Sequence, residues 1–149
     1  MYKTVVFDLD GTLLNTLTDL ADAGNRLCRK YGWPTHERQA YRYFVGNGIP
    51  KLVERLAPAD QRTPAVLEAA LADFKRDYGQ HLRDTTAPYP GIPEMLAKLK
   101  TNGVQLAVFS NKADALAKEV VKDYFGTQYF TIVRGQMTCL LYTSDAADD

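Results

Sequence analysis

The sequence lacks the features that would place it in a membrane, in a secretory pathway or on nucleic acid. No apolar run approaches the roughly 18 residues that a membrane-spanning helix needs, and the N-terminus shows no signal-peptide pattern. Its 18 basic and 18 acidic residues give a formal net charge of +0. Bulk electrostatics therefore predicts neither a nucleic-acid partner nor a membrane partner. We expect a cytoplasmic protein.

Cysteine is also scarce, with two among 149 residues. Cys28 falls on an apolar helical face, which favours a core position over a disulfide with the distant Cys139. Hydrophobic residues make up 46% and charged residues 24% of the chain, as in ordinary globular proteins. The small number of cysteines favours a reducing compartment. The length is enough for about one domain.

The first apolar run ends in two carboxylates. Residues 4–7 predict a short strand buried on both faces, and Asp8 and Asp10 follow it directly. Because side chains two apart in a strand point to the same side, these carboxylates share a face. Their repulsion predicts a cation between them, and Mg²⁺ is the hard, oxygen-seeking candidate. Gly11 permits a sharp turn and Thr12 offers a hydroxyl, while a solvated Asp-rich turn is the alternative interpretation.

The middle of the chain, residues 15–85, is predicted to be entirely helical. Apolar residues at helical spacing, with capping signals at Thr35 and at Thr63 before Pro64, favour four helices. Their expected ranges are about 17–31, 35–44, 49–56 and 64–78. Gly46, Asn47 and Gly48 form a tight, flexible turn between the second and third of them. His36 and His81 lie in polar segments and are expected at the solvated surface.

The second half of the chain alternates helices and strands. A Pro- and Gly-rich connector at 87–91 leads to a helix, then an apolar strand at 104–109, another helix and a strand at 129–133. Together with the first strand, this order predicts right-handed parallel crossovers. The expected fold class is α/β, a Rossmann-like parallel sheet core with an inserted all-helical segment.

Ser110, Asn111 and Lys112 follow the second strand, at the edge where open α/β sheets bind ligands. If the first two strands are neighbours, the Ser110 hydroxyl lies beside the carboxylates. With the backbone N–H groups of the next helix, it can then bind phosphate. The alternative is that Ser110 or Asn111 simply caps that helix. Lys112 either contacts phosphate or is an ordinary solvated lysine.

The run Asp-Leu-Asp-Gly-Thr at 8–12, directly after an apolar strand, resembles the first signature of the haloacid dehalogenase-like hydrolases. Val-Gly-Asn-Gly at 45–48, Tyr-Pro-Gly at 89–91 and Ser-Asn-Lys at 110–112 look most like the phosphoglycolate phosphatase group of that family. The resemblance covers residues 1–136. It implies a partial α/β core of residues 1–14 and 86–136, a mobile helical cap of residues 15–85, and a non-family tail of residues 137–149.

The resemblance also implies the chemistry. Asp8 would be the nucleophile that forms an aspartyl-phosphate, Asp10 the general acid and base, and both would bind Mg²⁺, the latter through its backbone carbonyl. The substrate would be a small phosphorylated metabolite. The remaining implied contacts are to phosphate, from Gly11, Thr12, Ser110, Asn111 and Lys112, and to substrate from the cap loop of Gly46, Asn47 and Gly48, for which a plain helix–helix turn is an equal alternative.

Beyond residue 136 the family continues with a loop lysine and a strand carrying further acidic metal ligands. Residues 137–149 show neither feature, so we expect a truncated reading frame with an unrelated tail. The expected consequences are weak Mg²⁺ binding, impaired turnover and an exposed edge on the first strand. A sugar phosphomutase of the same family and a non-catalytic phosphate-ester-binding fragment are the alternative functions. The sequence leaves the oligomeric state open.

Overall fold

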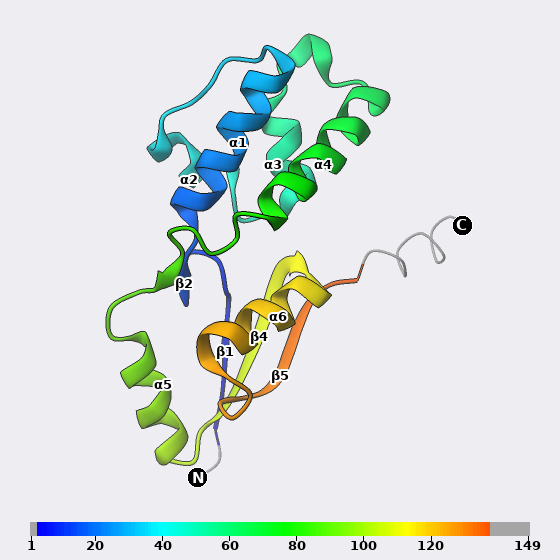
Figure 1. The fold of residues 1–149 in the computed structure, drawn as a ribbon. Coiled ribbons are helices and arrows are strands. Elements are labelled where there is room, and N and C mark those ends of the chain that lie inside the picture. The colour runs from blue at the N-terminus through cyan, green and yellow to red at the C-terminus, as the bar shows by residue number, and fades with distance from the viewer. Residues whose placement is uncertain (1–2, 138–149) are drawn as a thin grey trace, which may run out of the picture. The chain divides into compact units, whose positions relative to one another are not determined.

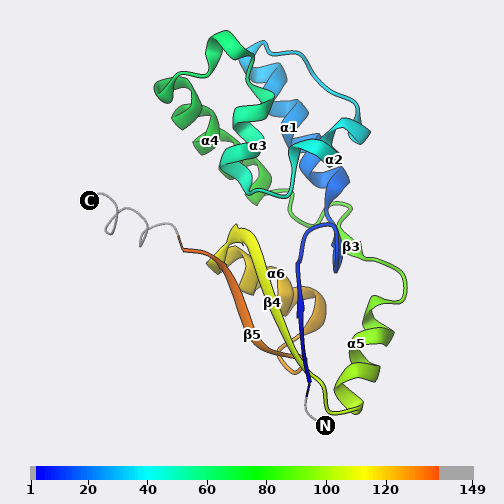
Figure 2. The same cartoon turned by 180° about the vertical axis from the view of Figure 1, so that it is seen from behind.

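The computed structural model describes residues 3–137. The chain divides into two compact units, Leu14–Ala87 (the helical unit) and Met1–Leu13 with Pro88–Asp149 (the sheet unit). Figures 1 and 2 show the ribbon from opposite sides. Within the described part of the chain, no helix is both long enough and apolar enough to span a bilayer.

The sheet unit contains a three-stranded parallel sheet in the order β1-β4-β5. Helix α6 packs against β4 and β5, and Figures 1 and 2 show it on one face of the sheet. This arrangement confirms the predicted α/β class with parallel crossovers. The elements are β1 (Thr4–Phe7), α5 (Ile92–Thr101), β4 (Gln105–Ala113), α6 (Asp114–Phe125) and β5 (Phe130–Gln136).

The expectation that the first strand is buried on both faces is wrong. Residues of β1 alternate between exposed and half-buried, because β1 is an edge strand among the described strands and only one sheet face carries α6. On that covered face, Phe130 contacts Phe7 and Phe125 edge-on. The opposite face carries side chains that are 56%, 53% and 42% exposed, those of Val6, Phe109 and Ile132. Among the described residues, the sheet thus buries one face and leaves large apolar side chains exposed on the other.

The helical unit contains four α-helices and two 3₁₀ turns. Gly32 ends the first helix in a left-handed conformation, and the Thr63 hydroxyl caps the last one by accepting from the Val66 N–H at 3.3 Å. Cys28 is fully buried, as expected for a core cysteine. The elements are α1 (Leu17–Tyr31), η1 (Arg38–Ala40), α2 (Tyr41–Phe44), α3 (Ile49–Leu56), η2 (Ala59–Gln61) and α4 (Pro64–Gly79).

The second predicted helix is shorter than expected, and Thr35 does not cap it. The Asn25 side chain donates to the His36 carbonyl at 2.9 Å and accepts from the His36 N–H at 3.0 Å. Both backbone groups of His36 are therefore engaged outside a helix, and helical structure begins only at Arg38. His36 is half-buried against the rings of Tyr41 and Phe44, which corrects its expected solvated position.

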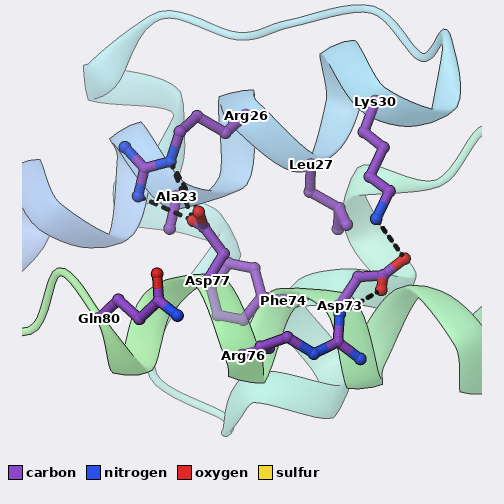
Figure 3. A pocket seen from close by; sticks show the side chains of 9 residues that line it. All are labelled: Ala23, Arg26, Leu27, Lys30, Asp73, Phe74, Arg76, Asp77 and Gln80. Atoms are coloured by element: carbon purple, nitrogen blue, oxygen red, sulfur yellow. Dashed lines mark hydrogen bonds and ion pairs between the residues drawn. The ribbon is translucent and has the colours of Figure 1, made fainter.

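A cavity of about 220 Å³ lies between α1 and α4 (Figure 3). Ion pairs join the two helices across it, from Arg26 to Asp77 at 2.8 Å and from Lys30 to Asp73 at 3.2 Å. Arg76 also reaches Asp73, at 2.9 Å. These three cations share two carboxylates and each of them is ion-paired, so the cavity is a helix–helix packing feature.

Asp73 is expected to make the helical unit sensitive to acid. The hydrogen bond from Tyr31 at 2.7 Å, with those from Arg76 and Lys30, lowers the pKa of Asp73 from 3.8 to about 2. Because the folded pKa lies below the unfolded value, the stability that Asp73 contributes is complete above about pH 4 and is lost towards about pH 2. In thermal unfolding followed by circular dichroism, Asp73→Asn should lower the midpoint at neutral pH and flatten its acid dependence. The exposed Asp22→Asn is the control, and an unchanged acid slope in Asp73→Asn would contradict the assignment.

Candidate functional site

Two carboxylates occupy the turn that follows β1. Leu9, between them, is fully buried, whereas Asp8 is exposed and the Asp10 side chain is 21% exposed. The Leu9 carbonyl accepts from the Thr12 N–H at 3.2 Å, and Gly11 has a left-handed φ of 82°. The tight turn expected at Gly11 is therefore present, and burial of Leu9 anchors the chain between the two carboxylates.

Lys112 pairs with Asp10. Its Nζ lies 3.3 Å from Oδ2 of Asp10, and its side chain is only 3% exposed. The pair forms because β1 and β4 are parallel neighbours, with Phe7 in register with Val108, so their carboxyl ends meet at one edge. The interpretation of Lys112 as an ordinary solvated lysine is thus wrong. Sequence indicated only that Lys112 follows a strand, not that its charge is buried against Asp10.

The other oxygen of Asp10, Oδ1, is buried and has no hydrogen-bond partner among the described residues. Oδ1 of Asp8 accepts from the Leu9 N–H at 2.8 Å, which leaves its second oxygen for another ligand. Within residues 3–137, no group of three or more His, Cys, Asp or Glu side chains is arranged to hold a metal. The Asp8 carboxylate with the backbone carbonyl of Asp10 fits Mg²⁺, since this ion usually keeps several waters and binds through one or two carboxylates plus substrate phosphate. The unsatisfied Oδ1 agrees with a ligand at this turn.

The segment with Ser110, Asn111 and Lys112 belongs to β4, which continues to Ala113 with a register shift after Phe109. The Ser110 hydroxyl accepts from the Lys112 N–H at 3.0 Å, and Asn111 is exposed. Because α6 has Ala113 as its N-cap residue, the alternative in which Ser110 or Asn111 caps this helix is wrong. Phosphate binding by Gly11, Thr12 and these three residues stays a prediction.

Gly135 and Asp114 support this segment, although neither was among the predicted site residues. The Gly135 N–H donates to Oδ1 of Asp114 at 2.8 Å. A Cβ on Gly135 would overlap the Lys112 carbonyl oxygen and lie 2.7 Å from the Asp114 Cα. The side-chain hydrogen bond from Lys118, followed by the one from Gly135, lowers the pKa of Asp114. Strand β5 therefore fixes the backbone that carries Lys112, and a glycine at the end of a strand was the available signal.

Gly135→Ala is expected to disturb the site while leaving the helical unit intact. The added methyl meets backbone atoms, so the segment must move, and overpacking of this kind costs about 1 to 3 kcal/mol. Chemical denaturation should show the loss, and NMR shifts should concentrate at Lys112 and Asp114. Gly79→Ala is the matched control because a Cβ there meets nothing within 4 Å. Equal effects of the two substitutions would contradict the tight contact at Gly135.

The loop of Gly46, Asn47 and Gly48 lies in the helical unit, between α2 and α3. Both glycines have positive φ values, 110° and 93°, which explains why glycine suits these two positions. Gly46 and Asn47 are exposed, and Gly48 is half-buried at the start of α3. The part that this loop plays towards a substrate stays a prediction.

Comparisons of the chain with a family model and with known proteins agree with one another. The family model of haloacid dehalogenase-like hydrolases matches residues 5–140. The chain is 33% identical over 134 residues to a phosphoglycolate phosphatase of Thiobacillus denitrificans, covering 88% of this chain and 59% of that protein. A phosphoglycolate phosphatase of Neisseria meningitidis is 35% identical over 136 residues, covering 89% of this chain and 58% of that protein. The chain thus spans less than two thirds of the length of these relatives.

Solved structures agree with the sequence relatives. The crystal structure of a candidate phosphoglycolate phosphatase from Lactobacillus delbrueckii subsp. bulgaricus superposes with a TM-score of 0.83 at 26% identity, covering 91% of this chain and 65% of that one. A second candidate phosphoglycolate phosphatase, from Haemophilus somnus, gives a TM-score of 0.79 at 27% identity, with 90% and 62% coverage. Together with the paired acidic turn at the end of β1, these matches show that the chain belongs to the haloacid dehalogenase-like hydrolase family.

Proposed function

We propose that this chain carries the nucleophile half of a Mg²⁺-dependent phosphomonoester hydrolase, acting on a small phosphorylated metabolite, with 2-phosphoglycolate as the first candidate. The observation that carries the proposal is the turn after β1, where Asp8 is open to solvent and Asp10 is paired with the buried Lys112. The named phosphoglycolate phosphatases at 33% and 35% identity support the substrate class. Because the chain spans 59% of the first of these relatives, the activity of the whole protein is part of the proposal.

In the first step, an oxygen of Asp8 attacks the phosphorus of the ester. The bond from phosphorus to the leaving oxygen breaks, and an aspartyl-phosphate forms on Asp8. Oδ1 of Asp10, the oxygen that does not pair with Lys112, supplies the proton that the leaving alkoxide needs. Exposure of Asp8 suits this step because the nucleophile must be reached by substrate.

In the second step, Asp10 takes a proton from water, and the resulting hydroxide attacks the phosphorus of the aspartyl-phosphate. The acyl–phosphate bond breaks, inorganic phosphate leaves and the Asp8 carboxylate is restored. Lys112 keeps the Asp10 carboxylate in place through both steps. Mg²⁺, when held by Asp8 and the backbone carbonyl of Asp10, supplies positive charge to offset the phosphoryl oxygens.

The helical unit is proposed to act as the cap of the enzyme. It is a continuous insertion, Leu14–Ala87, between the acidic turn that follows β1 and the rest of the sheet unit. A mobile lid of this kind excludes water and selects the leaving group. The loop of Gly46, Asn47 and Gly48 is the segment proposed to contact substrate, since its two left-handed glycines leave it little side-chain bulk.

The test is phosphate release by the 149-residue chain from a panel of phosphomonoesters, with and without Mg²⁺. We expect slow, Mg²⁺-dependent release with a preference for 2-phosphoglycolate, together with a phosphoryl adduct on Asp8 in rapid-quench mass spectrometry. Binding of the ester without release or adduct would instead favour a non-catalytic phosphate-ester-binding role. Conversion of a sugar phosphate to its isomer would favour the phosphomutase alternative, and turnover equal to that of the longer relatives would contradict the expected impairment.

A further inference from the structure

Asp19 is a buried carboxylate that the proposed chemistry does not use. It lies in the first turn of α1 and is only 2% exposed. Its partners are Thr85 and Thr86, which lie 66 and 67 residues further along the chain. The Thr85 and Thr86 hydroxyls donate to it at 2.7 Å, and their backbone N–H groups donate at 3.0 and 2.9 Å.

These contacts exceed what a first-turn acidic residue normally makes. Such a residue interacts favourably with the helix dipole and requires no long-range partner. Here burial raises the pKa of Asp19, but the hydrogen bonds from Thr85 and Thr86 offset it, and the net shift is downward. Four donors around one ionised carboxylate form a set of charge-assisted hydrogen bonds in a water-poor position.

The two bonded segments are the two ends of the helical unit. The chain enters this unit at Leu14 and leaves it at Ala87. Strand β2 (Leu14–Asn15) pairs with β3 (Ala87–Pro88), and the Tyr89 N–H donates to the Leu13 carbonyl at 3.3 Å. The two segments that connect the units, called here the crossings, therefore run side by side. The hydrogen bonds of Asp19 to Thr85 and Thr86 join them at the end that lies within the helical unit.

We propose that Asp19 is a positioning residue that locks the two crossings into one element, so that the helical unit swings about a single hinge. This inference rests on the proposed cap function. Two independent linkers would let a cap twist as well as swing. Here the two crossings are joined by β2–β3 pairing at one end and by the hydrogen bonds of Thr85 and Thr86 to Asp19 at the other, a set of contacts called here the Asp19 clamp. Two crossings joined in this way prevent the helical unit from twisting and leave it mainly a swinging motion. Asp19 would thus narrow the range of cap positions without touching substrate.

The first measurement is hydrogen exchange of the Thr85 and Thr86 amides in the full 149-residue chain. In the unaltered protein both amides should be protected, and in Asp19→Asn they should exchange about 10-fold faster or more, because an amide offers fewer and weaker acceptors. Asp22→Asn, an exposed acidic residue on the same helix, is the control. Unprotected Thr85 and Thr86 amides in the unaltered protein would overturn the proposal.

The second measurement asks whether the clamp restricts the cap. Spin labels at Lys75→Cys in α4 and Lys98→Cys in α5, in a Cys139→Ser background, report the spread of distances between the two units. Asp19→Asn should broaden that spread, while Asp22→Asn should not. If exchange at Thr85 and Thr86 rises but the spread stays the same, Asp19 is merely structural and the proposal fails. This readout needs no turnover, so it separates the hinge from the proposed phosphatase activity.

A milder variant covers the case in which Asp19→Asn does not fold. Thr86→Val removes one hydroxyl donor but keeps the backbone N–H, and Thr86→Ser restores the hydroxyl. The valine variant should broaden the distance spread and the serine variant should return it towards that of the unaltered protein. Equal spreads in the two variants would overturn the role of the Thr86 hydroxyl in the clamp.

Discussion

Asp8→Asn and Asp10→Asn are expected to stop the proposed reaction at different points. With p-nitrophenyl phosphate, whose leaving group needs little protonation, Asp10→Asn should still accept the phosphoryl group on Asp8. The variant should then accumulate the adduct, because water activation is lost and turnover falls roughly 10²- to 10⁴-fold. Asp8→Asn should give neither adduct nor release, since the nucleophile itself is absent. Intact-protein mass spectrometry after rapid quenching distinguishes the two outcomes.

Two controls make this result specific. Asp22→Asn and Asp123→Asn change exposed acidic residues outside the turn and should leave both adduct and release unchanged. A phosphoryl adduct on Asp8→Asn would show that another residue is the nucleophile. Equal adduct levels in Asp10→Asn and the unaltered chain would show that Asp10 has no part in hydrolysis of the intermediate.

Lys112→Met is expected to cause a large loss of stability in the sheet unit. The lysine side chain is 3% exposed and lies 3.3 Å from Asp10, so its removal leaves a partly buried carboxylate without its counter-ion. Breaking a buried ion pair in this way costs about 3 to 5 kcal/mol. The 21% exposure of Asp10 lets water screen part of the uncompensated charge, which places the expectation at about 3 kcal/mol, the lower end of that range. Urea denaturation followed by circular dichroism measures the change.

The double variant Asp10→Asn with Lys112→Met provides the control. It removes both charges, so it should be more stable than Lys112→Met alone and show a coupling energy well above zero. Lys118→Met removes the exposed half of the Lys118–Asp114 pair and should change stability by less than about 1 kcal/mol. Strict additivity of the two substitutions at the site would contradict a direct pair between Asp10 and Lys112.

The predicted elements that proved accurate are those specified by local sequence. Helix α1 has apolar residues at helical spacing and a glycine at its end, and α4 starts with Thr63 before Pro64. The pairing of β1 with β4 was only a condition of the predicted phosphate site, and the structure meets that condition. What sequence could not provide depends on distant contacts. Asn25 keeps His36 out of a helix from 11 residues away, a contact that no pattern within residues 35–44 reveals.

The acidic turn and the segment after the second strand were identified from motif and position, because the functional groups of a short motif come from residues that are adjacent in the sequence. The burial of Lys112 against Asp10 was not, since it depends on how the ends of two strands about 100 residues apart meet. Gly135 is a similar case: its need to be glycine comes from the backbone at Lys112 and Asp114. Burial of β1 was misjudged because an apolar run does not reveal which faces of its sheet are covered by helices.

The side-by-side crossings also bear on how the chain folds. Strand β1 must pair with β4, whose residues are made about 100 positions later, and closing so long a loop slows folding. The helical unit, however, is continuous in sequence and can form first. Once β2 pairs with β3 and Asp19 binds Thr85 and Thr86, the two halves of the sheet unit are held together at a common base. The loop that remains to be closed then covers only residues 7–13 and 89–108. A defect in the helical unit should therefore delay assembly of the sheet, although the helical unit contributes no strand to it.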